Sequence, residues 1–202
     1  MMKRKLFIWL VFGCACVLLA FTVLPGRYRL DTGKSEVYWK CDKHNGLVPF
    51  KDGHLTVHAD GSLYGRFDFD LHRFEVKDLD SKQYGTAKTI LENTLKNEFF
   101  EIDKYPEAYY ELYEAEPTPD DSLLFTGDLT FHGITNCVKF KGKIFKEGKY
   151  YRLTSGKFPI DRTDWGVYRL SPSLPYPDDE NGWTVTDTVW IRVDLYLEHE
   201  GR

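Results

Sequence analysis

The strongest constraint on the fold of this chain is an alternation of apolar and polar residues with a period of two. It is cleanest in residues 63–71 and 189–198, where every second residue is apolar or glycine. Side chains of a β-strand point alternately to the two faces of a sheet, so the pattern is typical of strands with one buried face. Tyr, Phe and Trp, which favour half-buried strands, make up 16% of the sequence. We therefore expect an all-β fold.

Residues 125–140, with the sequence FTGDLTFHGITNCVKF, show what the buried face contains. Gly127, Leu129 and Phe131 share one face, and Val138 and Phe140 resume it after a predicted Gly-Ile-Thr-Asn turn. Seven to nine strands at hairpin-length spacing predict a sandwich or a barrel. An eight-stranded barrel is wide enough either to fill with side chains or to hold a small ligand. The periodicity alone leaves both alternatives open.

One segment departs from this period. Ala87, Ile90, Leu91 and Leu95 follow one another at helical spacing, which predicts a single amphipathic helix. Thr86 is a suitable N-cap for it, because a threonine hydroxyl accepts hydrogen bonds from the first backbone amides of a helix. We expect the helix to pack its apolar stripe on the mouth of the barrel or on a sheet edge.

The N-terminus carries a different signal. Three basic residues precede an uncharged run at residues 6–24, which is long enough to cross a hydrocarbon core. A cleaved signal peptide, a lipoprotein signal at Cys14 or Cys16, and an uncleaved signal anchor all agree with this run. We assign residues 1–26 to a signal anchor or signal peptide and residues 27–202 to one barrel domain.

Each of these alternatives places the barrel in the cell envelope. The basic flank orients the barrel to the periplasmic side of the cytoplasmic membrane, either anchored there or released after cleavage. Without Lys3, Arg4 and Lys5 the chain has 24 basic and 31 acidic residues, a net charge of −7. This charge argues against a nucleic-acid partner.

Side chains for catalysis or metal binding do not form a recognisable motif. The six histidines lack ligand spacing, and His54 and His58 simply share the polar face of one strand. Asn45-Gly46 and His132-Gly133 read as turns. We therefore expect no enzyme activity, no cofactor and no metal. Residues 161–164, Asp-Arg-Thr-Asp, are either a strand-end turn held by an arginine–carboxylate pair or a clamp for a ligand head group.

The order of five motifs resembles the YceI-like family of bacterial lipid- or polyisoprenoid-binding proteins. They are SEVYWK at residues 35–40, GRFDFDL at 65–71, TLKNEFFEIDKYPEA at 94–108, TGDLTFHGIT at 126–135 and FPIDRTDWGV at 158–167. Together they cover nearly all of the predicted barrel domain, and the order is more specific than any one of them.

The resemblance implies an extended, lipocalin-like barrel of eight antiparallel strands with the apolar tail of a ligand inside it. Inward positions carried over from the motifs are Val37, Trp39, Phe67, Phe69, Leu71, Leu129 and Phe131. Leu91, Leu95, Phe99 and Phe100 would close the barrel, and Ile160, Arg162 and Trp165 would form the remaining wall or mouth.

Two departures from the family pattern concern the two cysteines of the exported part. Cys41 and Cys137 stand at positions of family motifs where other residues are usual. An oxidising compartment permits a disulfide between them, and the departures hint at that bridge, while two separate buried thiols are the alternative that the residues themselves favour. Cys137 also stands beside a lost lysine, which weakens any contact there with an anionic head group.

These observations predict a protein that carries or sequesters a polyisoprenoid or a similar long-chain amphiphile without catalysis. The alternative is a filled barrel that acts as an interaction module in the envelope. The expected partners are an isoprenoid or other long-chain lipid, the membrane through the N-terminal segment, and a second copy of the chain through aromatics such as Tyr109 and Trp190.

Overall fold

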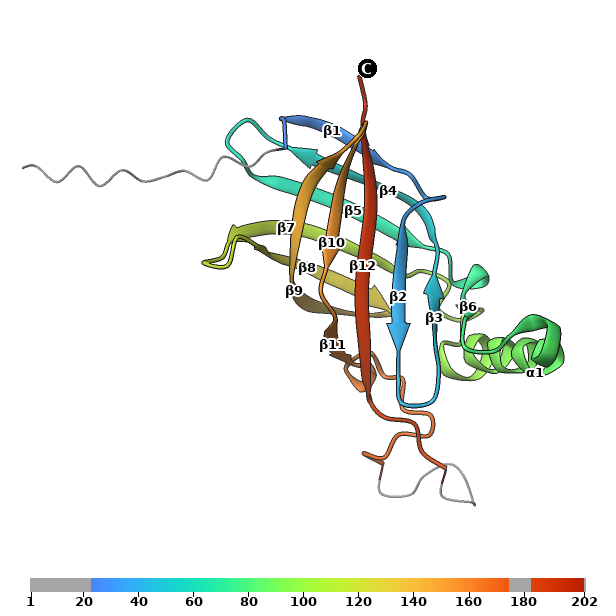
Figure 1. The fold of residues 1–202 in the computed structure, drawn as a ribbon. Coiled ribbons are helices and arrows are strands. Elements are labelled where there is room, and N and C mark those ends of the chain that lie inside the picture. Colours follow the sequence, from blue (N-terminus) through green and yellow to red (C-terminus); the bar gives the residue numbers. More distant parts are fainter. Residues whose placement is uncertain (1–22, 175–182, 202) are drawn as a thin grey trace, which may run out of the picture.

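A computed structural model describes residues 23–174 and 183–201, and the predicted N-terminal segment lies almost entirely outside them. The described chain is mostly strand, with one α-helix and three short helical turns (Figure 1). The strands are β1 Gly26–Leu30, β2 Glu36–Lys40, β3 Asn45–Val48, β4 Phe50–Val57, β5 Leu63–Phe69, β6 Glu75–Val76, β7 Tyr109–Pro117, β8 Leu123–Phe131, β9 Ile134–Glu147, β10 Tyr150–Ser155, β11 Phe158–Asp161 and β12 Thr188–His199. The helices are α1 Ser81–Thr94, the π-helical turn Leu95–Phe99, and 3₁₀ turns at Leu71–Arg73 and Arg162–Trp165.

The sheet closes on itself through β12, the long red strand in Figure 1. Its C-terminal half pairs with β10 and β1, and its N-terminal half pairs with β11 and β2. β2 and β3 therefore continue the positions of β1 and β4, which also pair with each other. The result is a closed antiparallel barrel of eight strand positions with one helix, which confirms the predicted fold.

The strand register follows the alternation in the sequence. Gly127 pairs with Val138 in the β8–β9 hairpin, and both are buried, whereas Asp128 on the opposite face pairs with Cys137. His132 and Gly133 form the turn, with φ values of 50° and 73°, as the His-Gly pair predicts. The Gly-Ile-Thr-Asn turn that the sequence also suggests would lie two residues further along the chain. Two consecutive positive φ values make the turn that matches the twist of paired strands.

Asn45-Gly46 is not a turn, contrary to the sequence prediction. β3 begins at Asn45, and the turn before it is closed by the Cys41 amide, which donates to the His44 carbonyl at 2.9 Å. Gly46 pairs with Trp39 on one side and Val76 on the other. The glycine is therefore part of the wall near the cavity described below.

α1 begins earlier than the sequence predicts. Asp80 is its N-cap, and the carboxylate accepts from the amides of Lys82 at 2.8 Å and Gln83 at 3.1 Å. Thr86 lies within the same span, two residues after Tyr84, whose φ of −123° and ψ of 23° kink the helix. Leu91 and Leu95 pack against a cluster formed by Trp39, Phe74 and Val76, so the helix covers β3 and β6 at the edge of the barrel (Figure 1).

Asp80→Ala should lower the free energy of unfolding by about 1 kcal/mol, because two amides of the first turn lose their acceptor. Thr86→Ala is the matched control, since it removes the side chain that the sequence pattern favours as the cap. We expect this control to be neutral or slightly stabilising, as alanine has the higher helix propensity. Chemical denaturation followed by circular dichroism measures both, and equal losses would contradict the assignment of Asp80.

The barrel core extends to the first described residue. Val23 is 4% exposed and belongs to the main apolar cluster, although the sequence pattern places it in the apolar N-terminal run. The Leu24 carbonyl accepts from the Tyr28 hydroxyl at 2.6 Å. Among the described residues, no helix has the length and apolar character that a membrane crossing requires.

The structure does not bear out the disulfide. Cys41 and Cys137 are both free thiols. Cys41 faces the interior of the barrel, where it lines a cavity, whereas Cys137 is exposed on the outside of β9. The sulfurs lie on opposite faces of the barrel wall, so the backbone would have to move before they could bond.

Of the two aromatics expected to be exposed, only one is. Trp190 is 44% exposed on the outer face of β12. Tyr109 is only partly exposed, because the Arg66 guanidinium lies over its ring at 3.6 Å from the centroid.

Candidate functional site

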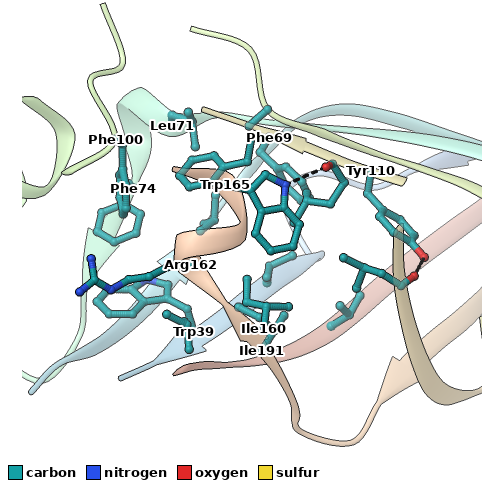
Figure 2. Close-up of a pocket in the computed structure, with 18 of the residues that line it drawn as sticks. Trp39, Phe69, Leu71, Phe74, Phe100, Tyr110, Ile160, Arg162, Trp165 and Ile191 are labelled. Carbon is teal, nitrogen blue, oxygen red and sulfur yellow. Dashed lines mark hydrogen bonds between the residues drawn. The ribbon is translucent and has the colours of Figure 1, made fainter. Parts of the chain in front are cut away.

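The barrel encloses an apolar cavity of about 220 Å³ on the side where α1 packs. Its wall comes from nearly every strand, and its mouth from the helix end, the two 3₁₀ turns and the segment before β12. Figure 2 shows aromatic and aliphatic side chains pointing into the space from all sides. Small-molecule sites are typically of this kind, concave and mostly apolar.

Thirteen of the fourteen residues predicted to bind the ligand line this cavity. They are Val37, Trp39, Phe67, Phe69, Leu71, Leu95, Phe99, Phe100, Leu129, Phe131, Ile160, Arg162 and Trp165. Leu91 is the exception. It packs instead against the cluster of Trp39, Phe74 and Val76.

The larger part of the wall was not predicted from the sequence, since 18 of the 31 lining residues were not among the predicted ligand contacts. The missed residues include Phe50, Phe74, Tyr110, Leu112, Val138, Phe140, Leu153, Phe158, Val189, Ile191, Val193 and Leu195. Those on β12 were open to prediction, because they occupy every second position of one uninterrupted strand. Phe74 was not, because it follows a 3₁₀ turn that interrupts the alternation.

A connected series of aromatic rings forms one side of the mouth. Trp39 stacks on Phe74 at 4.9 Å between ring centroids. Phe74 meets Phe100 edge to face at 5.2 Å, and Phe100 meets Phe131 in the same way at 5.3 Å. Such arrangements are the favourable ones for aromatic rings, so helix end, turn and hairpin are held together around the opening.

Most polar atoms in the lining are already bonded to the protein. The Tyr110 hydroxyl donates to the Val138 carbonyl at 3.0 Å, and the Trp165 indole donates to the Leu129 carbonyl at 2.9 Å. Burial raises the pKa of Tyr110, so its hydroxyl keeps the proton. Trp39 Nε1 is buried without a hydrogen-bond partner among the described residues. The wall thus presents an apolar surface to any occupant.

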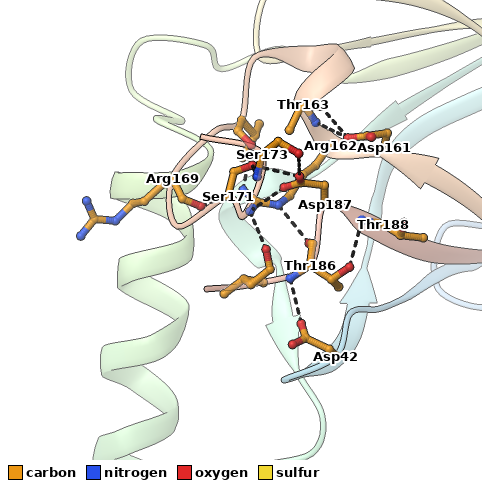
Figure 3. Close-up of polar contacts among 12 residues, drawn as sticks. Asp42, Asp161, Arg162, Thr163, Arg169, Ser171, Ser173, Thr186, Asp187 and Thr188 are labelled. Carbon is orange, nitrogen blue, oxygen red and sulfur yellow. Dashed lines mark hydrogen bonds and ion pairs between the residues drawn. The ribbon is translucent and has the colours of Figure 1, made fainter. Parts of the chain in front are cut away.

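Arg162, the one charged residue in the lining, is also fully engaged (Figure 3). Its guanidinium donates to four backbone carbonyl oxygens, at 2.7 to 3.2 Å, belonging to Val167, Arg169, Val185 and Thr186. It also pairs with the Asp187 carboxylate at 3.2 Å. Burial lowers the pKa of Arg162, but an arginine stays charged at neutral pH.

This arginine organises the mouth. The carbonyls that it binds belong to the segments before and after residues 175–182, and Asp187 in turn accepts from the hydroxyls of Ser171 at 2.9 Å and Ser173 at 2.5 Å. Asp161 caps the 3₁₀ turn by accepting from the Thr163 amide at 2.9 Å. The contacts match the first interpretation of residues 161–164, a strand-end turn with an arginine–carboxylate pair, and they leave no donor for a ligand head group.

His132 makes a second set of polar contacts between segments at the mouth. The sequence pattern had indicated only a turn at this residue. Its ring is nearly buried, with Nδ1 at 3.0 Å from the Trp165 carbonyl and Nε2 at 2.9 Å from the Glu101 carboxylate. Both neighbours are acceptors. His132 therefore joins the β8–β9 turn to Glu101, which follows the helix, and to the 3₁₀ turn at Arg162–Trp165.

Within residues 23–174 and 183–201, no group of three or more His, Cys, Asp or Glu side chains is placed to hold a metal ion. The cavity is therefore the one candidate site that combines enclosure with a defined chemical character among the described residues.

Solved structures share this architecture. BcnA of Burkholderia cenocepacia superposes with a TM-score of 0.62 at 18% identity, covering 83% of this chain and 98% of that one. A polyisoprenoid binding domain from Saccharophagus degradans, described as implicated in plant cell wall breakdown, gives 0.58 at 12% identity, covering 86% and 98%. At these identities the likeness concerns the fold.

Sequence relatives extend the comparison. A UPF0312 protein of Pseudomonas putida F1 is 27% identical over 157 residues, which are 73% of this chain and 77% of the relative. A UPF0312 protein of Pseudomonas syringae pv. syringae is 26% identical over 144 residues, covering 64% and 74%. The model of the YceI-like domain matches residues 28–197, which make up the whole barrel, and the chain therefore belongs to the YceI-like family.

Proposed function

We propose that this protein binds the apolar chain of a polyisoprenoid or similar long-chain amphiphile inside its barrel, and so carries or sequesters that lipid in the cell envelope. The observation that carries the proposal is the enclosed apolar cavity. A barrel whose inward aromatics filled the lumen would offer no such space, so the cavity disfavours the filled-barrel alternative.

Binding needs no chemistry from the protein. Each methylene group transferred from water to such a lining contributes about 0.8 kcal/mol, and part of this is lost to the entropy of association. Among the described residues, the lining has Cys41 as a free thiol but no carboxylate or histidine, and Arg162 and Tyr110 are both bonded within the wall. A carrier is therefore the simplest function for this site.

Two further observations support the proposal. The structurally similar domain of Saccharophagus degradans is described as polyisoprenoid-binding. The basic residues and apolar run at residues 1–24 are those of an exported or membrane-anchored protein, and such a location would bring the barrel close to membrane lipids.

The test is native mass spectrometry of the full-length protein, purified from a bacterial host in a nonionic detergent, with extraction and identification of bound lipid. We expect a stoichiometric adduct with a long apolar chain. Ile191→Trp, which fills the cavity, should abolish the adduct. Arg192→Trp is the matched control on the outer face of the same strand, where Trp190 already stands, and it should retain the adduct.

Two results would overturn the proposal. One is a clean apo mass that incubation with isoprenoid alcohols leaves unchanged. The other is equal loss of the adduct in both variants, which would place the lipid outside the barrel.

A further inference from the structure

We propose that the cavity is a blind chamber, closed at the end remote from α1, which accepts a limited length of uncharged chain however long the ligand is. This inference rests on the proposed function, because it concerns the ligand of the same cavity. It makes the floor of the chamber the part of the protein that determines how much of the ligand is held.

On each of several strands, the residues that line the cavity stop at the same level of the barrel. On β12 every second residue from Val189 to Leu195 lines the cavity, whereas Leu197, the next on that face, does not and is 0% exposed. On β10 Leu153 lines the cavity and Tyr151 does not. On β4 Phe50 lines it, whereas Leu55 lies beyond it, fully buried. The cavity therefore ends at one level around the barrel.

The floor below that level is a packed layer of large side chains. Tyr28, Leu55, Phe125 and Leu197 are each 0% exposed. The rings of Tyr28 and Tyr151 meet edge to face at 5.3 Å, and Phe125 lies 5.2 Å from Phe140, which lines the cavity. Interiors packed in this way do not open without cost.

The other end of the barrel has a separate hollow of about 290 Å³. It is lined by residues of β1 and the end of β12, including Arg29, Asp31 and His199, and it shares no residue with the cavity. Among the described residues, therefore, no passage runs through the barrel from end to end.

The dimensions limit the inserted chain to a short one. From Val189 to Leu195 the lining covers about 20 Å along β12, and strand tilt reduces this to about 15 Å along the barrel axis. A polyprenyl chain longer than this must leave its remainder outside the mouth.

The lining also selects against charge. The only charged side chain is Arg162, and its donors are directed to four carbonyls and Asp187. An anionic group drawn into the cavity would lose its hydration without gaining a counter-ion, and this is costly in an apolar surrounding. The inserted part of the ligand is therefore uncharged, and a phosphate placed there would oppose binding.

The experiment measures the affinity of the delipidated full-length protein, in a nonionic detergent, for geraniol, farnesol, geranylgeraniol and solanesol. Farnesol should bind at least tenfold more tightly than geraniol, because the added isoprene unit is buried. Geranylgeraniol and solanesol should gain less than about twofold over farnesol. Farnesyl phosphate, which is farnesol with an anionic head, should bind no more tightly than farnesol, because the lining offers the phosphate no counter-ion and the head must stay outside the mouth.

A floor variant tests the mechanism directly. Phe140→Leu opens space between the cavity and the floor. In this variant the affinity should continue to rise from farnesol to geranylgeraniol and level off only there. Phe145→Leu is the matched control, on the same strand but 40% exposed outside the barrel, and should leave the series unchanged. The wild-type series decides the question even if Phe140→Leu fails to fold.

Each outcome has a separate meaning. Affinity that keeps rising to solanesol in the wild-type protein would overturn the blind chamber and leave lipid binding intact. Farnesyl phosphate bound at least tenfold more tightly than farnesol would overturn the selection against charge. If none of the four alcohols bound, the proposed function itself would be contradicted.

Discussion

Arg162→Leu should lower the free energy of unfolding by about 3–5 kcal/mol, the cost of removing one partner from a buried ion pair. Leucine keeps the apolar part of the cavity wall but leaves four backbone carbonyls and the Asp187 carboxylate without their donor. Buried acceptors that lose their hydrogen bonds cost the full desolvation penalty. Urea denaturation followed by circular dichroism measures the change.

Two further variants separate the carbonyl contacts from the ion pair. Asp187→Asn removes the counter-ion and keeps the shape, so it should cost less than Arg162→Leu, about 1–3 kcal/mol. Arg192→Leu is the control, because Arg192 is exposed and its nearest carboxylate oxygen, on Glu36, is 3.9 Å away. Exposed pairs of this kind contribute about 0–1 kcal/mol. If Arg162→Leu were as stable as this control, the network would have no structural role.

The barrel wall was predictable because the alternation of apolar and polar residues along each strand shows which side chains share a face. Parity placed Phe67 and Phe69, and likewise Leu129 and Phe131, on one apolar face. The family resemblance placed these faces inside the barrel, and the structure has all four residues in the cavity lining. One helix in a β-chain was predictable for the same reason, from local spacing. Its start was not, since Asp80 and Thr86 are both acceptable caps and only the folded chain shows which carboxylate or hydroxyl meets the free amides.

The mouth was less predictable, because its contacts join distant segments. Arg162 binds carbonyls up to 24 residues away in the sequence, and His132 contacts a residue 31 positions before it and one 33 positions after it. No local pattern contains such pairings. The thiol pair was wrong for a different reason, because the family departures that hinted at a disulfide carried no geometric information, and the structure has Cys41 inside the barrel and Cys137 outside.

At Gly46 a local sequence pattern was misleading because contacts with distant segments decide the structure. Replacing this glycine gives the second of the two largest expected effects. Asn-Gly predicts a turn, yet Gly46 lies in a strand and its φ is not positive. What requires the glycine is space. A Cβ atom there would lie 1.9 Å from the Glu75 carbonyl oxygen and 2.8 Å from Trp39 Nε1. Real Cβ atoms do not approach so closely, so either β6 or the Trp39 ring at the cavity mouth must move.

Gly46→Ala should therefore destabilise the fold by about 3 kcal/mol, the upper part of the range for overpacking, and should weaken ligand binding as Trp39 shifts. Gly85→Ala is the matched control, since nothing lies within 4 Å of its Cβ position in α1. There alanine should stabilise by about 0.5–1 kcal/mol. Opposite signs for two identical substitutions, measured by urea denaturation, would show that tertiary packing rather than turn geometry selects glycine at position 46. If Gly46→Ala left the free energy of unfolding unchanged, β6 would be able to move without cost. The aromatic side of the mouth would then be a deformable part of the cavity wall.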